Sequence, residues 1–127
     1  MKVLVAEKDP VLRDQVIMGL NAFADMEVHE ASGLMALDRI RHGEYNVLVL
    51  GLGLGADDPG FDLLDRLRSD DLEIDIVVVA TEGIISQLRE EKARGRIFAF
   101  LVNPLDPVEF FRTLARLIHR REPAAGS

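Results

Sequence analysis

The chain has 127 residues, 48% of them hydrophobic and 29% charged, which fits one soluble globular domain and excludes a disordered chain. No apolar run approaches the roughly 20 residues of a membrane span, and no cysteine is present for a disulfide or thiolate site. The net charge of −7 disfavours nucleic acid, since the cations cluster only at Arg112, Arg116, Arg120 and Arg121. We therefore expect a cytoplasmic protein that binds neither membranes nor nucleic acid directly.

The first third of the chain predicts two strand–helix units. The run Val3–Ala6 is continuously apolar, which favours a strand buried on both faces. Asp9, followed by a proline, is expected to cap a helix, and the weaker run 26–31 then predicts an edge strand. Ser32 is expected to cap a second helix that ends near Gly43. The first helix carries one apolar stripe, formed by Leu12, Val16, Leu20 and Phe23.

The middle of the chain predicts two further units. Val47–Leu50 predicts a buried strand and, after a glycine-rich loop, Phe61–Ser69 predicts a helix. Ile76–Ala80 predicts the next strand, and Thr81 is expected to cap a helix that stops near Gly95. The helix after the glycine-rich loop is predicted to turn three residues inward: Leu63, Leu64 and Leu67.

The last unit contains the helix with the clearest start signal. Phe98–Val102 predicts a strand, and the four residues 106–109, Asp-Pro-Val-Glu, resemble a capping box. We expect one domain over residues 1–121, followed by a linker-like tail over 122–127. The apolar face of this helix is predicted to consist of Val108, Phe111, Leu114, Ala115 and Ile118.

Five β–α units with short connections leave few topologies, because crossovers between parallel strands are right-handed. The fold class we predict is α/β: a flavodoxin-like three-layer sandwich with five helices and a five-stranded parallel sheet of order 2-1-3-4-5. In such a sheet the functional edge lies at the carboxyl ends of strands 1 and 3.

Four stretches carry a family resemblance, through their order and spacing: Val3–Pro10, Tyr45–Gly51, Val77–Thr81 and Phe100–Pro104. Together they resemble the receiver domain of bacterial response regulators (CheY-like), the phosphorylation-switched module of two-component systems. The resemblance implies an acidic pair that holds Mg²⁺, an aspartate that accepts the phosphoryl group, and a Ser or Thr and a Lys that contact it. Such a site combines nucleophilic catalysis with charge neutralisation.

Several of these functional positions have lost their chemistry in this chain. The acidic pair falls on Glu7 and Lys8, so one carboxylate has become a cation, which would stand in the metal pocket. The acceptor falls on Gly51, which has no side chain, and the lysine falls on the neutral Asn103. The hydroxyl is kept as Thr81. We therefore expect a pseudo-receiver with no catalytic residue, no metal and no cofactor.

Two further family positions are kept in kind. The switch aromatic falls on Phe100, and the proline after the lysine falls on Pro104, with a cis bond expected between Asn103 and Pro104. Other interpretations stay open at two sites. Thr81 is a relic of the switch or a helix cap, and Glu7 with Asp9 is a residual metal site or a surface beside a helix cap.

The glycine-rich segment Gly51–Gly55 formally fits a dinucleotide fingerprint after a strand. Asp57 and Asp58 count against it, because they would face the pyrophosphate, and the following proline and glycine delay the helix that should bind it. Within the segment, Leu52 and Leu54 are expected to fold onto the core or to form an apolar contact patch.

The function we predict is phosphorylation-independent signalling through protein–protein interaction. The partner would be another protein, a fused effector domain, or a second copy bound through the face of the fourth helix, fifth strand and fifth helix. One alternative is phosphorylation at Asp57 or Asp58, and another is a small nucleotide or ligand bound by the glycine-rich loop. The proposed dimer face carries five charged residues: Arg89, Arg112, Arg116, Glu90 and Glu91.

Overall fold

The computed structural model describes residues 1–53, 59–70 and 73–121, and it contains the five predicted strand–helix units. The strands form one parallel sheet in the order β2-β1-β3-β4-β5, as predicted. The strands are β1 (Lys2–Ala6), β2 (Glu27–Glu30), β3 (Val47–Leu52), β4 (Asp75–Ala80) and β5 (Ala99–Val102). The helices are α1 (Pro10–Asn21), α2 (Gly33–His42), α3 (Pro59–Ser69), α4 (Ile85–Ala93) and α5 (Pro107–Arg121), with a 3₁₀ turn, η1 (Glu82–Ile84), before α4.

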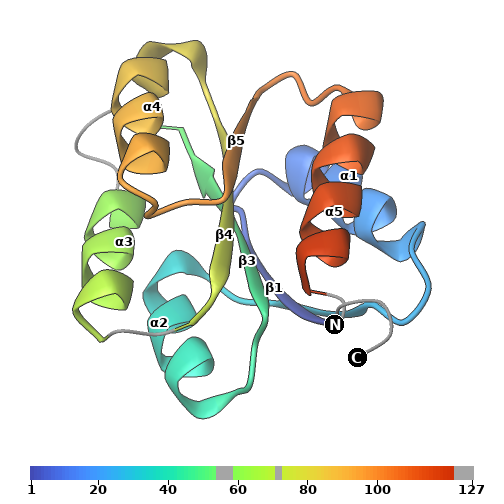
Figure 1. The fold of residues 1–127 in the computed structure, drawn as a ribbon, viewed down its shortest axis with the longest axis horizontal. Coiled ribbons are helices and arrows are strands. Elements are labelled where there is room, and N and C mark those ends of the chain that lie inside the picture. Colours follow the sequence, from blue (N-terminus) through green and yellow to red (C-terminus); the bar gives the residue numbers. More distant parts are fainter. Residues whose placement is uncertain (54–58, 71–72, 122–127) are drawn as a thin grey trace.

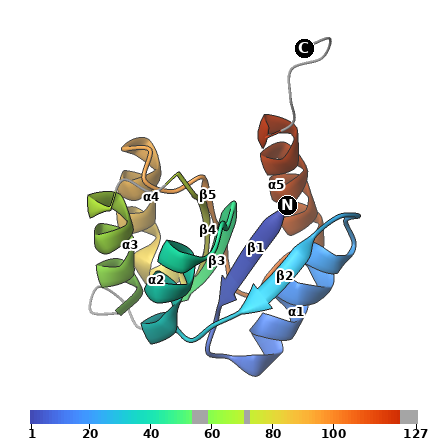
Figure 2. The same cartoon turned by 90° about the horizontal axis from the view of Figure 1, so that it is seen from below.

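The helices cover both faces of the sheet, which gives three layers. Figures 1 and 2 show α1 and α5 on one face, and α2, α3 and α4 on the other. Alternate side chains of the central strands enter the two cores, so Leu48 and Val78 lie on the α2–α3–α4 side and Val49 and Val77 on the α1–α5 side. Burial on both faces explains why these strands are continuously apolar.

Side-chain capping was predicted correctly at two helices and wrongly at two. Asp9 Oδ1 accepts a hydrogen bond from the Val11 amide at 2.9 Å, and Asp106 Oδ1 accepts one from the Val108 amide at 2.9 Å. Ser32 and Thr81 also occupy N-cap positions with extended backbone, but neither side chain makes a capping bond. Thr81 precedes the 3₁₀ turn rather than α4 itself.

The buried face of α5 differs from the prediction. Phe111 and Val108 are exposed, whereas the adjacent Phe110 is buried against α1. The reason is Gly19: a Cβ there would lie 2.5 Å from the Phe110 ring, so the absent side chain makes room for that ring. The predicted face is wrong at Val108 and Phe111, whereas Leu114 is buried and Ala115 and Ile118 are half-buried. The buried residues of α5 are Phe110, Thr113, Leu114 and Leu117.

Strand β3 is longer than predicted and includes Gly51. Gly51 pairs with Val79 and Leu52 with Ala80 in the register with β4. Leu52 is buried, which confirms that it folds onto the core, and its burial extends the strand beyond Leu50. Leu54, Asp57, Asp58 and the tail 122–127 lie outside the described residues. No helix of the described ranges is long and apolar enough to span a bilayer.

Candidate functional site at the carboxyl edge of the sheet

The parallel topology brings the ends of four strands to one edge of the sheet. Ala6 pairs with Leu50, so Glu7, the residue after β1, comes level with Gly51 in β3. The candidate residue pair Glu7 and Gly51 therefore lies on two neighbouring central strands, as the family resemblance implies.

The other two strand ends complete this edge. Ala80 of β4 pairs with Val102 of β5. The residues that follow these two, Thr81 and Asn103, therefore lie next to each other at this edge. The Asn103 amide donates a hydrogen bond to the Ala80 carbonyl at 2.8 Å, which continues the pairing one residue beyond β5. The Asn103–Pro104 peptide bond is cis, as expected.

The central observation at this edge is where the Glu7 side chain lies. A Cβ built on Gly51 would be 1.5 Å from Glu7 Oε2 and 2.4 Å from Glu7 Cδ, distances at which two atoms overlap. The Glu7 carboxylate thus occupies the space in which a side chain at position 51 would begin. Its other oxygen, Oε1, accepts a hydrogen bond from the Asp9 amide at 2.9 Å, which helps to hold the carboxylate in this position.

The prediction that Lys8 would fill the pocket as a cation differs from the structure. Lys8 is exposed and forms no ion pair with Glu7 or with any other residue in the described ranges. Lys8 lies at a bend of the chain between β1 and α1, whereas the Glu7 carboxylate lies beside Gly51. The group that fills the space beside Gly51 is therefore an anion.

The described part of this edge offers few oxygen ligands for Mg²⁺. In proteins Mg²⁺ is usually bound through one or two carboxylates, with waters completing its octahedral coordination. Of the carboxylates here, Glu7 already accepts the Asp9 amide, and Asp9 accepts the Val11 amide. Nowhere in the described part of the chain do three or more His, Cys, Asp or Glu side chains form a group that could hold a metal ion.

The aromatic and basic positions of the predicted interaction face are spread over β5 and α5. Phe100 is half-buried and packs against the core on the α2–α3–α4 side. Arg112 is exposed, and Arg116 donates a hydrogen bond to the Thr113 hydroxyl at 3.4 Å.

The acidic residues expected to pair across a dimer already have partners within the chain. Glu91 binds Arg96 with an N–O separation of 3.2 Å, and Glu90 forms an ion pair with Arg94 one helical turn away. These contacts leave less charge on the α4–β5–α5 face for pairing with a second copy than the sequence alone indicates.

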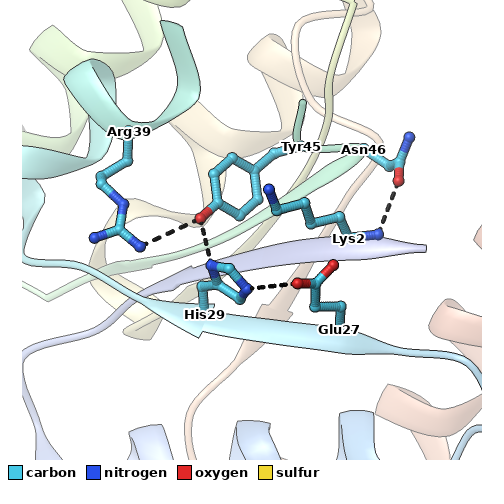
Figure 3. A network of polar contacts seen from close by, with 6 residues as sticks. All are labelled: Lys2, Glu27, His29, Arg39, Tyr45 and Asn46. Atoms are coloured by element: carbon cyan, nitrogen blue, oxygen red, sulfur yellow. Dashed lines mark hydrogen bonds and ion pairs between the residues drawn. The ribbon is translucent and has the colours of Figure 1, made fainter. Parts of the chain in front are cut away.

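A polar network near the start of β3 is absent from the sequence-based prediction (Figure 3). The Tyr45 hydroxyl lies 2.8 Å from His29 Nδ1, and His29 Nε2 lies 3.1 Å from Glu27 Oε1. Arg39 Nη2 donates a hydrogen bond to the Tyr45 hydroxyl at 3.4 Å. The Lys2 ammonium lies 4.8 Å from the centroid of the Tyr45 ring. The network joins edge strand β2 to α2 and to Tyr45, two residues before β3. No sequence spacing links these residues.

A hollow of about 710 Å³ lies at the opposite, amino edge of the sheet, beside the start of β4. Asp75, which is largely buried, binds Arg120 at 3.2 Å and Arg121 at 2.7 Å. The Arg120 guanidinium also lies 5.5 Å from the centroid of the Phe98 ring. These contacts fix the C-terminal end of α5 to the sheet.

Comparison with solved structures places this fold among receiver domains. The receiver domain of Francisella response regulator 1452 has a TM-score of 0.78 and 21% identity, with 95% of this chain and 98% of that chain covered. The REC domain of AraT, a response regulator from Geobacillus stearothermophilus, has a TM-score of 0.76 and 25% identity, covering 94% and 93%. The Escherichia coli RcsC C-terminus, which contains a linker region and a phosphoreceiver domain, has a TM-score of 0.80 and 17% identity, covering 100% and 49%.

No protein-family model matches the chain, and no curated protein does. The structural likeness shows that the chain has the receiver fold, with the strand order and helices predicted from its sequence.

Proposed function

We propose that this domain is a pseudo-receiver of two-component type, which signals by binding a protein and does not carry a phosphoryl group. The observation that carries the proposal is the Glu7 carboxylate in the space beside Gly51, where the acceptor side chain would stand. No nucleophile is left at that position, and an anion already fills the volume. The domain would then act as a folded binding surface in the cytoplasm.

Electrostatics support the same conclusion. Phosphoryl transfer needs a divalent cation and a basic group to neutralise the developing charge. Asn103 supplies a neutral amide where the family has a lysine, and the Lys8 side chain is exposed. Glu7 adds negative charge beside the acceptor position, Gly51. Loss of the acceptor removes the group that would form the bond to phosphorus, and loss of the second acidic residue and of the lysine removes the charge neutralisation that the transfer uses.

The partner we propose is either a separate protein or an effector domain joined through residues 122–127. The similar RcsC fragment carries its phosphoreceiver domain together with a linker region. A second copy bound through the α4–β5–α5 face would use Arg112 and Arg116. The ion pairs of Glu90 with Arg94 and of Glu91 with Arg96 within the chain leave fewer acidic partners for these arginines on that face.

The direct test is intact mass after incubation with a small phosphodonor and Mg²⁺. We expect no adduct on the wild-type protein. A stable single-phosphoryl adduct that Asp57→Asn or Asp58→Asn abolishes would instead establish phosphorylation at a non-standard residue. A receiver domain with an intact aspartate serves as the positive control for the phosphodonor.

Nucleotide binding by the Gly51–Gly55 segment is less favoured by the register. Gly51 and Leu52 pair with β4, so the segment does not begin a loop at its first glycine as the fingerprint requires. A bound nucleotide at about 100 times its Kd would stabilise the fold by about 2.7 kcal/mol. We expect a thermal-shift scan of common nucleotides to show no such stabilisation.

A further inference from the structure

Exposed apolar side chains gather on α1 and α5. Five large apolar residues of the described ranges are more than half exposed, and four of them belong to these two helices. On α1 they are Val11, 67% exposed, and Met18, 74% exposed. On α5 they are Val108, 57% exposed, and Phe111, 52% exposed. This concentration is unusual because single exposed apolar residues are normally scattered over a surface.

The two helices pack directly against each other, with aromatic rings at their contact. The position of a Gly19 Cβ lies 2.5 Å from the Phe110 ring, and Phe111 stacks on Phe23 with a centroid distance of 4.8 Å and an interplanar angle of 19°. Figures 1 and 2 show α1 and α5 on the same face of the sheet. Phe111 therefore lies at the line where the two helices meet.

Helical geometry places Met18 and Val11 on the outer face of α1. The buried stripe of α1 is centred on Val16, and Met18 and Val11 lie about 160° and 140° round the helix from it. Val108 likewise lies about 160° round α5 from the buried Phe110. Val11, Met18, Phe111 and Val108 therefore lie on the exposed sides of two neighbouring helices, and we call this set the α1–α5 surface.

The α1–α5 surface has an acidic border on one helix and a basic border on the other. Asp14 lies three residues after Val11 and four before Met18, on the side away from α5. Arg112 lies four residues after Val108, on the side of α5 away from α1. Both are exposed, and neither has an ion pair within the described ranges.

We propose that the α1–α5 surface binds a second copy of this chain. A two-fold axis through the α1–α5 surface would lay α1 of one copy on α5 of the other. Asp14 of each copy would then meet the partner copy's Arg112. An isologous interface must be self-complementary in this way. One acidic and one basic border satisfy that condition, and the paired charges offset the repulsion between two chains of net charge −7.

This inference rests on the proposed binding function for its role in signalling, and it concerns a surface that shares α5 and Arg112 with the α4–β5–α5 face but uses α1 in place of α4 and β5. Burial of Met18 and Phe111 would supply most of the affinity, since apolar and aromatic residues at the centre of an interface dominate binding. The border charges would set the orientation of the two copies.

Sedimentation velocity of residues 1–127 over a wide concentration range tests the proposal. We expect a concentration-dependent dimer, and we expect Met18→Glu to weaken its association constant by about tenfold or more. The matched control is Met35→Glu, since Met35 is 53% exposed on α2 and lies outside the α1–α5 surface. Circular dichroism and the melting temperature of each variant show that it is folded.

A charge exchange tests the predicted pairing separately. Asp14→Arg or Arg112→Asp alone should weaken the dimer, and the two changes together in one chain should restore it. A protein that is monomeric at every concentration overturns the inference. So does a dimer that Met18→Glu leaves intact, or one that the double exchange does not restore. None of these outcomes alters the phosphodonor result, so failure of the dimer and failure of the proposed function are distinguishable.

Discussion

The two edges of the sheet differ in what their polar residues do. At the amino edge, Asp75 joins α5 to β4, and the Tyr45–His29 pair joins β3 to β2. At the carboxyl edge, Glu7 fills a space beside Gly51 and, among the residues that the structure describes, accepts a hydrogen bond from the backbone amide two residues later. The same strands thus carry a tightly cross-linked edge and an edge whose side chains have few partners. The difference shows that, among the described residues, side-chain contacts between elements are concentrated at the amino edge of the sheet.

The largest expected effect comes from Asp75 at the amino edge. Asp75→Ala leaves Arg120 and Arg121 without their carboxylate, and we expect the free energy of unfolding to fall by about 2 kcal/mol, as for other hydrogen bonds to charged groups. Denaturant unfolding measures this change. Asp65→Ala is the control, because Asp65 forms an exposed ion pair with Arg68 that should add little. Equal losses in the two variants would contradict the importance given to the amino edge.

Tyr45→Phe tests the network shown in Figure 3. Removing the hydroxyl leaves the half-buried His29 ring without its partner on Nδ1 while the aromatic packing remains. We expect a loss of about 1 kcal/mol in the free energy of unfolding. If a double-mutant cycle with His29→Ala finds no coupling between the two residues, the network does not stabilise the fold.

A double-mutant cycle at Glu7 and Gly51 tests the crowding at the carboxyl edge. Alanine is favoured over glycine within a strand by about 0.5–1 kcal/mol, but here its Cβ must displace the Glu7 carboxylate. We therefore expect Gly51→Ala to stabilise the Glu7→Ala protein more than it stabilises the wild type. Strictly additive effects on the free energy of unfolding would mean that Glu7 does not occupy the space beside Gly51 in solution.

The smallest effect concerns acid stability at the ion pair between α2 and the end of α3. The hydrogen bond from Arg41, 2.5 Å long, holds the pKa of Asp70 below its ordinary value of 3.8. A carboxylate with a lowered folded-state pKa stabilises the fold above its unfolded pKa, and this contribution disappears as the pH falls through the folded pKa.

The variant that isolates this pair is Asp70→Asn. We expect it to be slightly less stable than the wild type at neutral pH and equally stable once the pH is well below 3.8. Thermal unfolding as a function of pH measures the difference. A gap between the two proteins that widens toward low pH would contradict the assignment.

The strands and most helix starts could be predicted from the sequence because local chemistry determines them. Val3–Ala6 and Ile76–Ala80 are continuously apolar since both faces of the sheet are covered. The side chains of Asp9 and Asp106 cap helices by accepting hydrogen bonds from backbone amides two residues later. These features need only near neighbours in the chain. The strand order followed from the handedness of crossovers and not from any single residue.

The errors share a different cause, which is contact between segments far apart in sequence. Helical periodicity alone cannot decide between the adjacent Phe110 and Phe111, and the choice depends on Gly19 in another helix. The position at which β3 ends depends on the burial of Leu52 in the core on the α2–α3–α4 side of the sheet. The missing acceptor at Gly51 is evident in the sequence, whereas the carboxylate that replaces it is evident only in the structure.

The measurement that tests the central claim most directly is the intact mass of the Gly51→Asp protein after incubation with a small phosphodonor and Mg²⁺. The new aspartate would meet the Glu7 carboxylate, with no second acidic residue at Lys8 and no lysine at Asn103. Our account predicts no phosphoryl adduct on this variant. It also predicts that an adduct appears only when Lys8→Asp and Asn103→Lys are added. Phosphate uptake by Gly51→Asp alone, at the rate of an intact receiver domain, would contradict it.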